Sequence, residues 1–159
     1  MMPPESWIGF FEWCEATYLG TLVRDSVWLF PIIEAAHLVA LCVLGGAILV
    51  VDLRLLGLGL TGQRLSDLAR HVRPWLLGGV AVMLSTGVLL FLSEAIKCFY
   101  NTSFWVKMMT LPAAIAFTFA VKNRSLDGLE TSARSRVLGA VSIALWFTVA
   151  AAGRWIGYS

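Results

Sequence analysis

The sequence predicts an all-α fold: a membrane four-helix up-down bundle with an N-terminal amphipathic helix in the membrane interface. Of the 159 residues, 58% are hydrophobic and only 14% are charged, and the mean hydropathy is +0.79. This composition is typical of integral membrane proteins and lies far from that of soluble domains. Four apolar runs approach the roughly 20 residues that a spanning helix needs, and short connections join them. We therefore expect a single integral membrane domain over residues 1–159.

The N-terminal amphipathic helix is expected over residues 6–22. Hydrophobic side chains recur there at intervals of three and four residues, and Glu12 and Glu15 lie on the opposite side, which predicts a helix with one apolar face. The apolar face consists of Trp7, Phe10, Phe11, Cys14, Tyr18 and Leu22. We expect this helix to lie in the plane of the outer interface.

The four spans are expected at residues 27–51, 75–93, 104–121 and 137–157. A second amphipathic helix, over residues 63–72, is expected to lie along the inner surface before Pro74 turns the chain into the second span. Small residues let helices approach closely in lipid. Three of the spans carry such residues at Gly45, Gly46, Gly78, Gly79 and Gly139. The same glycines can line a contact between copies, so we also expect a homo-oligomer.

The basic residues predict the orientation in the membrane. They gather in the connections between the first and second spans and between the third and fourth spans. These residues are Arg54, Arg64, Arg70, Arg73, Lys122, Arg124, Arg134 and Arg136. The positive-inside rule then places both connections in the cytoplasm and both termini in the periplasm of a bacterial inner membrane. The net charge of +2 mostly reflects this bias, so the expected partner is the lipid bilayer and no nucleic acid.

Four ionisable side chains interrupt the apolar spans, namely Glu34, His37, Lys107 and Arg154. An uncompensated charge inside a membrane costs several kcal/mol, so such residues usually mark a functional site. At about 1.5 Å per residue, Glu34, Lys107 and Arg154 fall at similar depths in the outer half, and His37 lies one helical turn deeper than Glu34. One carboxylate facing two permanent cations leaves an excess of positive charge. We therefore expect an anion or water beside them.

A b-type haem would supply that negative charge. Its propionates suit Lys107 and Arg154, and its iron takes a neutral imidazole such as His37, with methionine as a known second axial ligand. Met83 lies near the depth of His37. The residues expected to contact the cofactor are His37, Met83, Lys107, Arg154, Glu34 and Trp146, with His37 as the metal ligand. The sequence thus predicts a haem or metal site for electron transfer, served by a redox partner.

Other functions are compatible with the same residues. Copper is a second metal hypothesis because Cys14, Cys42 and Cys98 offer soft sulfur ligands, although no C-x-x-C spacing occurs. Cys14 and Cys98 both belong to the outer side, where they can instead form a disulfide. Glu34 and His37 can also serve a proton- or ion-conducting subunit, or the charges can be structural in an assembly protein without a cofactor. Motifs of the classical enzymes are absent from the sequence, so no enzyme class is predicted.

Two further polar residues lie near the inner surface. His71 falls about 20 Å from His37 along the membrane normal, so we expect it to be solvated and expect no bis-histidine haem within one chain. Asp52 lies 18 residues after Glu34 on the same stripe of the first span. It predicts either an ion pair with Arg54 that anchors the helix end or a second polar site. Of the two we favour the ion pair, because charges at span ends reach water easily.

Several strings of the sequence resemble a family of small bacterial four-span membrane proteins known only as a domain of unknown function. The similarity runs from Ser26 almost to the end, and its most specific parts are W-L-F-P-x-I-E-x-x-H at residues 28–37, D-L-R-L-L-G at 52–57 and G-R-W at 153–155. The positions that this resemblance implies as hallmarks are Trp28, Pro31, Glu34, His37, Asp52, Arg54, Lys107 and Arg154. The family often has an asparagine where this chain has Ala116. The resemblance implies where a site lies and implies no activity.

Overall fold

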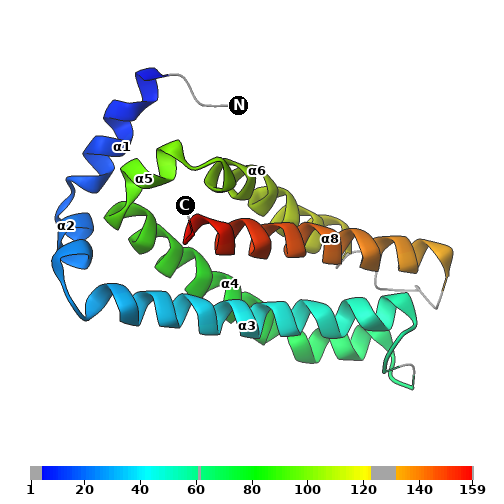
Figure 1. Ribbon diagram of the computed structural model, residues 1–159. Coiled ribbons are helices and arrows are strands. Elements are labelled where there is room, and N and C mark those ends of the chain that lie inside the picture. Colours follow the sequence, from blue (N-terminus) through cyan, green and yellow to red (C-terminus); the bar gives the residue numbers. More distant parts are fainter. Residues whose placement is uncertain (1–4, 61, 123–131, 159) are drawn as a thin grey trace.

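The computed structural model describes residues 5–60, 62–122 and 132–158. Arg124, one of the basic residues predicted to face the cytoplasm, lies outside these ranges. Within them the chain is helical and has no strand, which confirms the predicted all-α class (Figure 1). The helices are η1 (Glu5–Trp7), α1 (Ile8–Glu15), α2 (Tyr18–Asp25), α3 (Leu29–Leu56), α4 (Leu65–Ser93), α5 (Ala95–Tyr100), α6 (Thr102–Ala116), η2 (Phe117–Lys122) and α8 (Ala133–Ile156), of which η1 is a 3-10 turn and η2 is π-helical.

Among the described residues, four helices are long and apolar enough to cross a membrane, as expected of a multi-pass membrane protein. They are α3, α4, α8 and the segment Thr102–Ala120, in which η2 continues α6. α3 packs along α4 and α8, and α6 packs along α8. The four spans therefore form the predicted bundle (Figure 1). We call the end at which α3 begins and α8 ends the outer end, after the predicted orientation, and the opposite end the inner end.

The second span begins earlier than predicted, because α4 continues without interruption across Pro74. The separate surface helix predicted over residues 63–72 is therefore wrong. Proline removes one helical hydrogen bond and crowds the preceding turn, but the apolar face before it packs on the inner end of α3. Leu65 is buried there with Val51 and Leu55. Tertiary packing of this kind supplies most of the stability of a helix and outweighs the local preference.

The N-terminal amphipathic segment forms two helices instead of one, and α1 and α2 lie across the outer end of the bundle (Figure 1). The single helix predicted over this segment is wrong because Thr17 caps the second helix. Its Oγ1 accepts a hydrogen bond from Gly20 N (3.2 Å) and donates one to Cys14 O (2.7 Å). Phe11 and Cys14 are buried, because α1 packs on α5. The remaining members of the predicted apolar face, Trp7, Phe10, Tyr18 and Leu22, are exposed.

The glycines of the spans divide into two groups. A Cβ on Gly79 would lie 3.0 Å from Leu44 Cβ, and a Cβ on Gly139 would lie 3.1 Å from Asp52 O. These two glycines therefore allow α3 to approach α4 and α8 closely. By contrast, added Cβ atoms on Gly45, Gly46 and Gly78 would meet nothing within 4 Å. This second group faces away from the packed interior.

Candidate functional site

His37 lies on α3 in the outer half of the bundle and is half-buried. Its Nδ1 is 2.8 Å from Thr86 Oγ1 on α4, and a Cβ on Gly87 would lie 3.4 Å from its Cε1. Thr86 Oγ1 donates to Val82 O at 2.6 Å, so the hydroxyl proton is directed at the helix backbone. The hydroxyl oxygen then accepts the Nδ1–H of His37. We assign this tautomer from the hydrogen-bond network, and it leaves Nε2 with its lone pair.

Lys107 approaches the same region from α6. Its side chain is half-buried, and it packs over Gly153 of α8, where an added Cβ would lie 3.4 Å from Nζ. Lys107 interacts electrostatically with His37. Among the described residues, no acceptor within hydrogen-bond distance of Nζ is found. The outer site, defined by His37, Thr86, Lys107 and Gly153, thus receives one residue from each span and contains a cation without an anionic partner.

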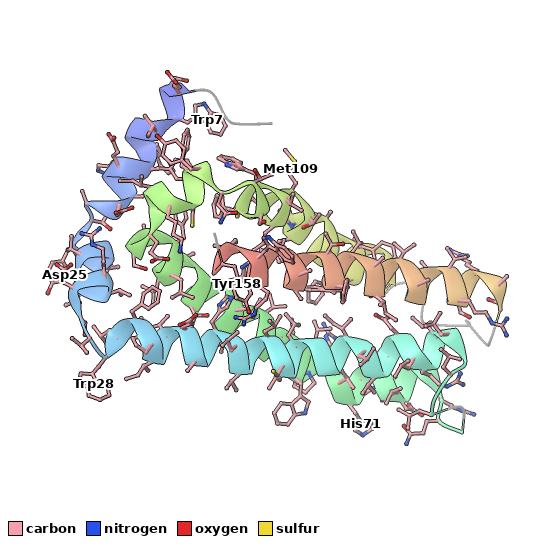
Figure 2. The ribbon with its side chains drawn as sticks, viewed as in Figure 1. Trp7, Asp25, Trp28, His71, Met109 and Tyr158 are labelled. Carbon is pink, nitrogen blue, oxygen red and sulfur yellow. The ribbon has the colours of Figure 1, made fainter. Side chains whose placement is uncertain are left out.

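The structure does not bring Glu34 and Arg154 together. Both are exposed at the outer end. The Arg154 guanidinium donates to the Tyr158 hydroxyl and lies over its ring, with Cζ 4.5 Å from the centroid. Tyr158 follows the end of α8, beside which Figure 2 labels it, and its side chain is exposed. Ion pairs between described residues occur where Arg24 meets Glu15 and Asp25.

Met83 and Trp146 lie deeper than the outer site, in a closely packed apolar core. Met83 is one turn inward of Thr86 on α4, and Trp146 donates its Nε1–H to Thr118 Oγ1 of the π-helical segment at 3.0 Å. The buried members of this core are Ala40, Leu44, Ala47, Ile48, Leu76, Met83, Ala114, Trp146 and Val149. The core separates the outer site from the polar residues at the inner end of the bundle.

Asp52 is fully buried at the inner end, with 0% of its surface exposed. The helix-end ion pair that we favoured for it stays a prediction, and the burial shows that Asp52 does not reach water as a charge at a span end usually does. Gly139 allows α8 to cross α3 beside Asp52, and Ser135 and Ser142 are buried on the same face of α8. Asp52 follows His37 by 15 residues, or about 22 Å along the helix. The bundle therefore has two polar sites that apolar packing keeps apart.

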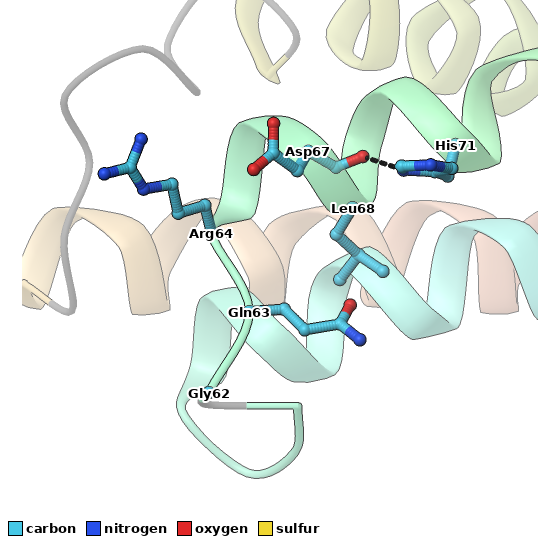
Figure 3. A pocket seen from close by; sticks show the side chains of 6 residues that line it. All are labelled: Gly62, Gln63, Arg64, Asp67, Leu68 and His71. Atoms are coloured by element: carbon cyan, nitrogen blue, oxygen red, sulfur yellow. Dashed lines mark hydrogen bonds between the residues drawn. The ribbon is translucent and has the colours of Figure 1, made fainter.

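Two hollows in the surface lie away from the outer site. One of about 480 Å³ opens at the inner end, where Gly62, Gln63, Arg64, Asp67, Leu68 and His71 line it (Figure 3). His71 is exposed there, as predicted. Its Nδ1 is 2.7 Å from Asp67 O. A second hollow of about 290 Å³ lies along α2. Neither includes a residue of the outer site.

Sequence reasoning located His37 and Lys107 but missed Thr86 and Gly153. A threonine or glycine in a membrane helix is an ordinary packing residue, so neither stands out before its neighbour is known. Among the described residues, histidine, cysteine and acidic side chains form no group of three that could hold a metal ion. The copper hypothesis, like the axial role of Met83 and the contact of Trp146 with a haem ring, stays a prediction.

A comparison with protein-family models finds one that matches residues 10–159, described as a family of unknown function (DUF6644). The matched range contains the four spans, the outer site and Asp52. No curated protein and no solved structure matches the chain.

Proposed function

The chain belongs to the DUF6644 family of unknown function, and we propose from its outer site that it is a membrane electron-transfer protein that binds a b-type haem through His37. The observation that carries this proposal is the hydrogen bond between His37 and Thr86. Histidine ligands of metals usually donate their second ring N–H to a neighbouring acceptor, which orients the ring and raises the basicity of the ligating nitrogen. Here Thr86 is that acceptor, and Nε2 is the nitrogen left for iron.

A single interior imidazole suits haem better than an isolated metal ion. The macrocycle supplies four nitrogen ligands, so haem iron needs only one or two ligands from protein. Protein-bound zinc needs three or four ligands, and blue copper sites use three close ones. Of the alternatives raised by the sequence, haem is therefore the metal group whose requirements match the outer site.

Lys107 provides a second reason for an anionic ligand. A half-buried ammonium without a hydrogen-bond acceptor is costly, and a carboxylate would offset that cost through a charge-assisted bond. Haem carries two carboxylates. In this proposal Lys107 binds one of them and Arg154, exposed at the rim, binds the other from the aqueous side. Glu34 lies one turn outward of His37 and is exposed, so we assign it no ligand role.

When bound, the haem would supply a one-electron redox couple. The chain's own residues would then divide the work. Thr86 holds the His37 tautomer, Lys107 balances negative charge, and the apolar core beneath them excludes water. An electron carrier also requires a redox partner. Separately, the outward-facing Gly45, Gly46 and Gly78 leave room for contact with a second copy of the chain. We place the protein in the bacterial inner membrane with both termini outside.

Proton or ion conduction is the competing function. It requires polar groups or water along the whole path, whereas about 22 Å separate His37 from Asp52 and the intervening side chains form the apolar core. This separation favours a group bound in the outer half over a path across the membrane.

An optical spectrum tests the proposal. The full-length protein is purified in detergent from cells supplied with a haem precursor, and spectra are recorded oxidised and then reduced with dithionite. We expect a Soret band that shifts on reduction, together with sharpened α and β bands. A purified, folded protein without a Soret band, and without haem gained by titration of the apoprotein, would refute the proposal.

Thr86→Val should weaken haem binding by about 10- to 100-fold, the usual cost of removing a partner that orients a histidine ligand. Valine keeps the branched shape and removes the acceptor of the Nδ1–H. Haem titration of the apoprotein measures this change. Ser85→Ala is the matched control, because Ser85 is exposed and donates to Ala81 O in its own helix. Equal affinities for the two variants would contradict the role of Thr86.

A further inference from the structure

Cys14 of α1 and Cys98 of α5 lie in one buried cluster at the outer end of the bundle. The buried members are Phe11, Cys14, Ala95, Cys98, Phe99 and Phe104. Both cysteines are free thiols in this structure, and α1 packs directly on α5. We call Cys14 and Cys98 the cysteine pair.

Contacts on either side bring the cysteine pair into register. The ring centroid of Phe11 lies 5.1 Å from that of Phe99. Glu15 Oε2 accepts a hydrogen bond from Ile96 N at 2.7 Å. A later residue of α1 thus contacts an earlier residue of α5, so the two helices run antiparallel where they meet. Cys14 comes between the two contacting residues of α1, and Cys98 comes between those of α5. Both cysteines therefore lie within the short stretch over which the two helices meet, and they belong to one buried cluster.

We propose that Cys14 and Cys98 form a disulfide that fastens α1 to α5. The proposal rests on the predicted orientation, which places both helices in an oxidising compartment. Each thiol loses its hydrogen, the S–S bond forms, and two electrons and two protons pass to the disulfide of a thiol–disulfide exchange protein, which becomes a dithiol. The bond would close a loop between residues far apart in the sequence and hold the N-terminal helices against the bundle.

The surroundings of the pair support a bond that persists once formed. Burial, together with the nearby Glu94 carboxylate, raises the pKa of Cys98 to about 11, and burial raises the pKa of Cys14. Stabilised thiolates are what make a disulfide easily reduced, and at neutral pH this pair remains protonated. For the same reason the folded dithiol reacts slowly, so the bond should form before the cluster packs.

Peptide mapping of the full-length protein provides the test. Cells are lysed in denaturant with N-ethylmaleimide, and the protein is digested with trypsin without reduction. Mass spectrometry should find the peptide Cys98–Lys107 linked to the peptide that contains Cys14, two hydrogens lighter than the sum of the two. Cys42, which is exposed on α3, should carry the label and serves as the internal control.

Two variants sharpen the result. Cys14→Ser should convert Cys98 into a labelled thiol, whereas Cys42→Ser should leave the linked peptide unchanged. The proposal is overturned if both members of the pair carry N-ethylmaleimide in the wild-type protein, or if Cys98 is linked to Cys98 of another copy. Mapping of the wild-type protein decides the matter even if Cys14→Ser fails to fold.

Discussion

His37→Ala is expected to reduce the Soret absorbance of the purified protein to less than about a tenth of the wild-type value. Among the described residues it is the one histidine inside the bundle, and haem iron without a protein ligand is poorly retained. The substitution also removes one hydrogen bond to Thr86, worth about 1 kcal/mol. The helical bundle should therefore persist, which the circular dichroism spectrum and elution volume of the variant will check.

The matched control is His71→Ala. His71 is exposed on the inner part of α4 and bonds to Asp67 O within its own helix, so its loss should leave the spectrum unchanged. A His37→Ala protein that keeps the wild-type spectrum would exclude His37 as the ligand. Loss of the Soret band in both variants would point to a general failure of assembly.

Gly79→Val is expected to destabilise the bundle by about 3 kcal/mol, the upper part of the range for overpacking a core. A Cβ at this position would lie 3.0 Å from Leu44 Cβ, 3.2 Å from Leu44 Cα and 3.3 Å from Leu44 N. Two of these atoms belong to the backbone of α3, so relief requires α3 and α4 to move apart. Close packing is the main force that holds helices together in lipid, and thermal unfolding in detergent should show a melting temperature lower by several degrees.

The neighbouring Gly78 provides the control. An added Cβ there would meet nothing within 4 Å, so Gly78→Val introduces the same β-branched residue into the same helix without the clash. It should retain nearly the wild-type melting temperature. If the two variants melt alike, helix propensity and not the contact with Leu44 accounts for the effect. A changed elution volume for Gly78→Val alone would locate a contact between copies.

Much of the fold is decided by composition and by the length of the apolar runs. A lipid bilayer requires about 20 apolar residues per span and internal pairing of every backbone polar group, so four such runs predict four helices. The hydropathy pattern also identifies His37 and Lys107, because a titratable group within an apolar run stands out in the sequence whatever its neighbours in space are.

Periodicity failed at two places, one decided by a contact between distant segments and one by a local helix cap. Pro74 predicts a break that the packing of Leu65 on α3 prevents. Thr17 introduces a cap within a segment whose apolar spacing predicts one helix. In both cases a contact or hydrogen bond outweighed a periodicity that extends over only a few turns.

The direction of each polar side chain around its helix is what only the tertiary structure decided. Glu34 and His37 are one turn apart on α3, yet one is exposed and the other is half-buried against Thr86. Arg154 faces the surface while the adjacent Gly153 lies against Lys107. In a soluble helix the polar face turns outward and sets the rotation. α3 is surrounded by lipid on one side and by apolar side chains on the other, so hydropathy does not distinguish the two sides. The side of α3 that faces the other helices is therefore set by close contacts such as that of Leu44 with Gly79. Such a contact joins two helices and cannot be inferred from the sequence of either one alone.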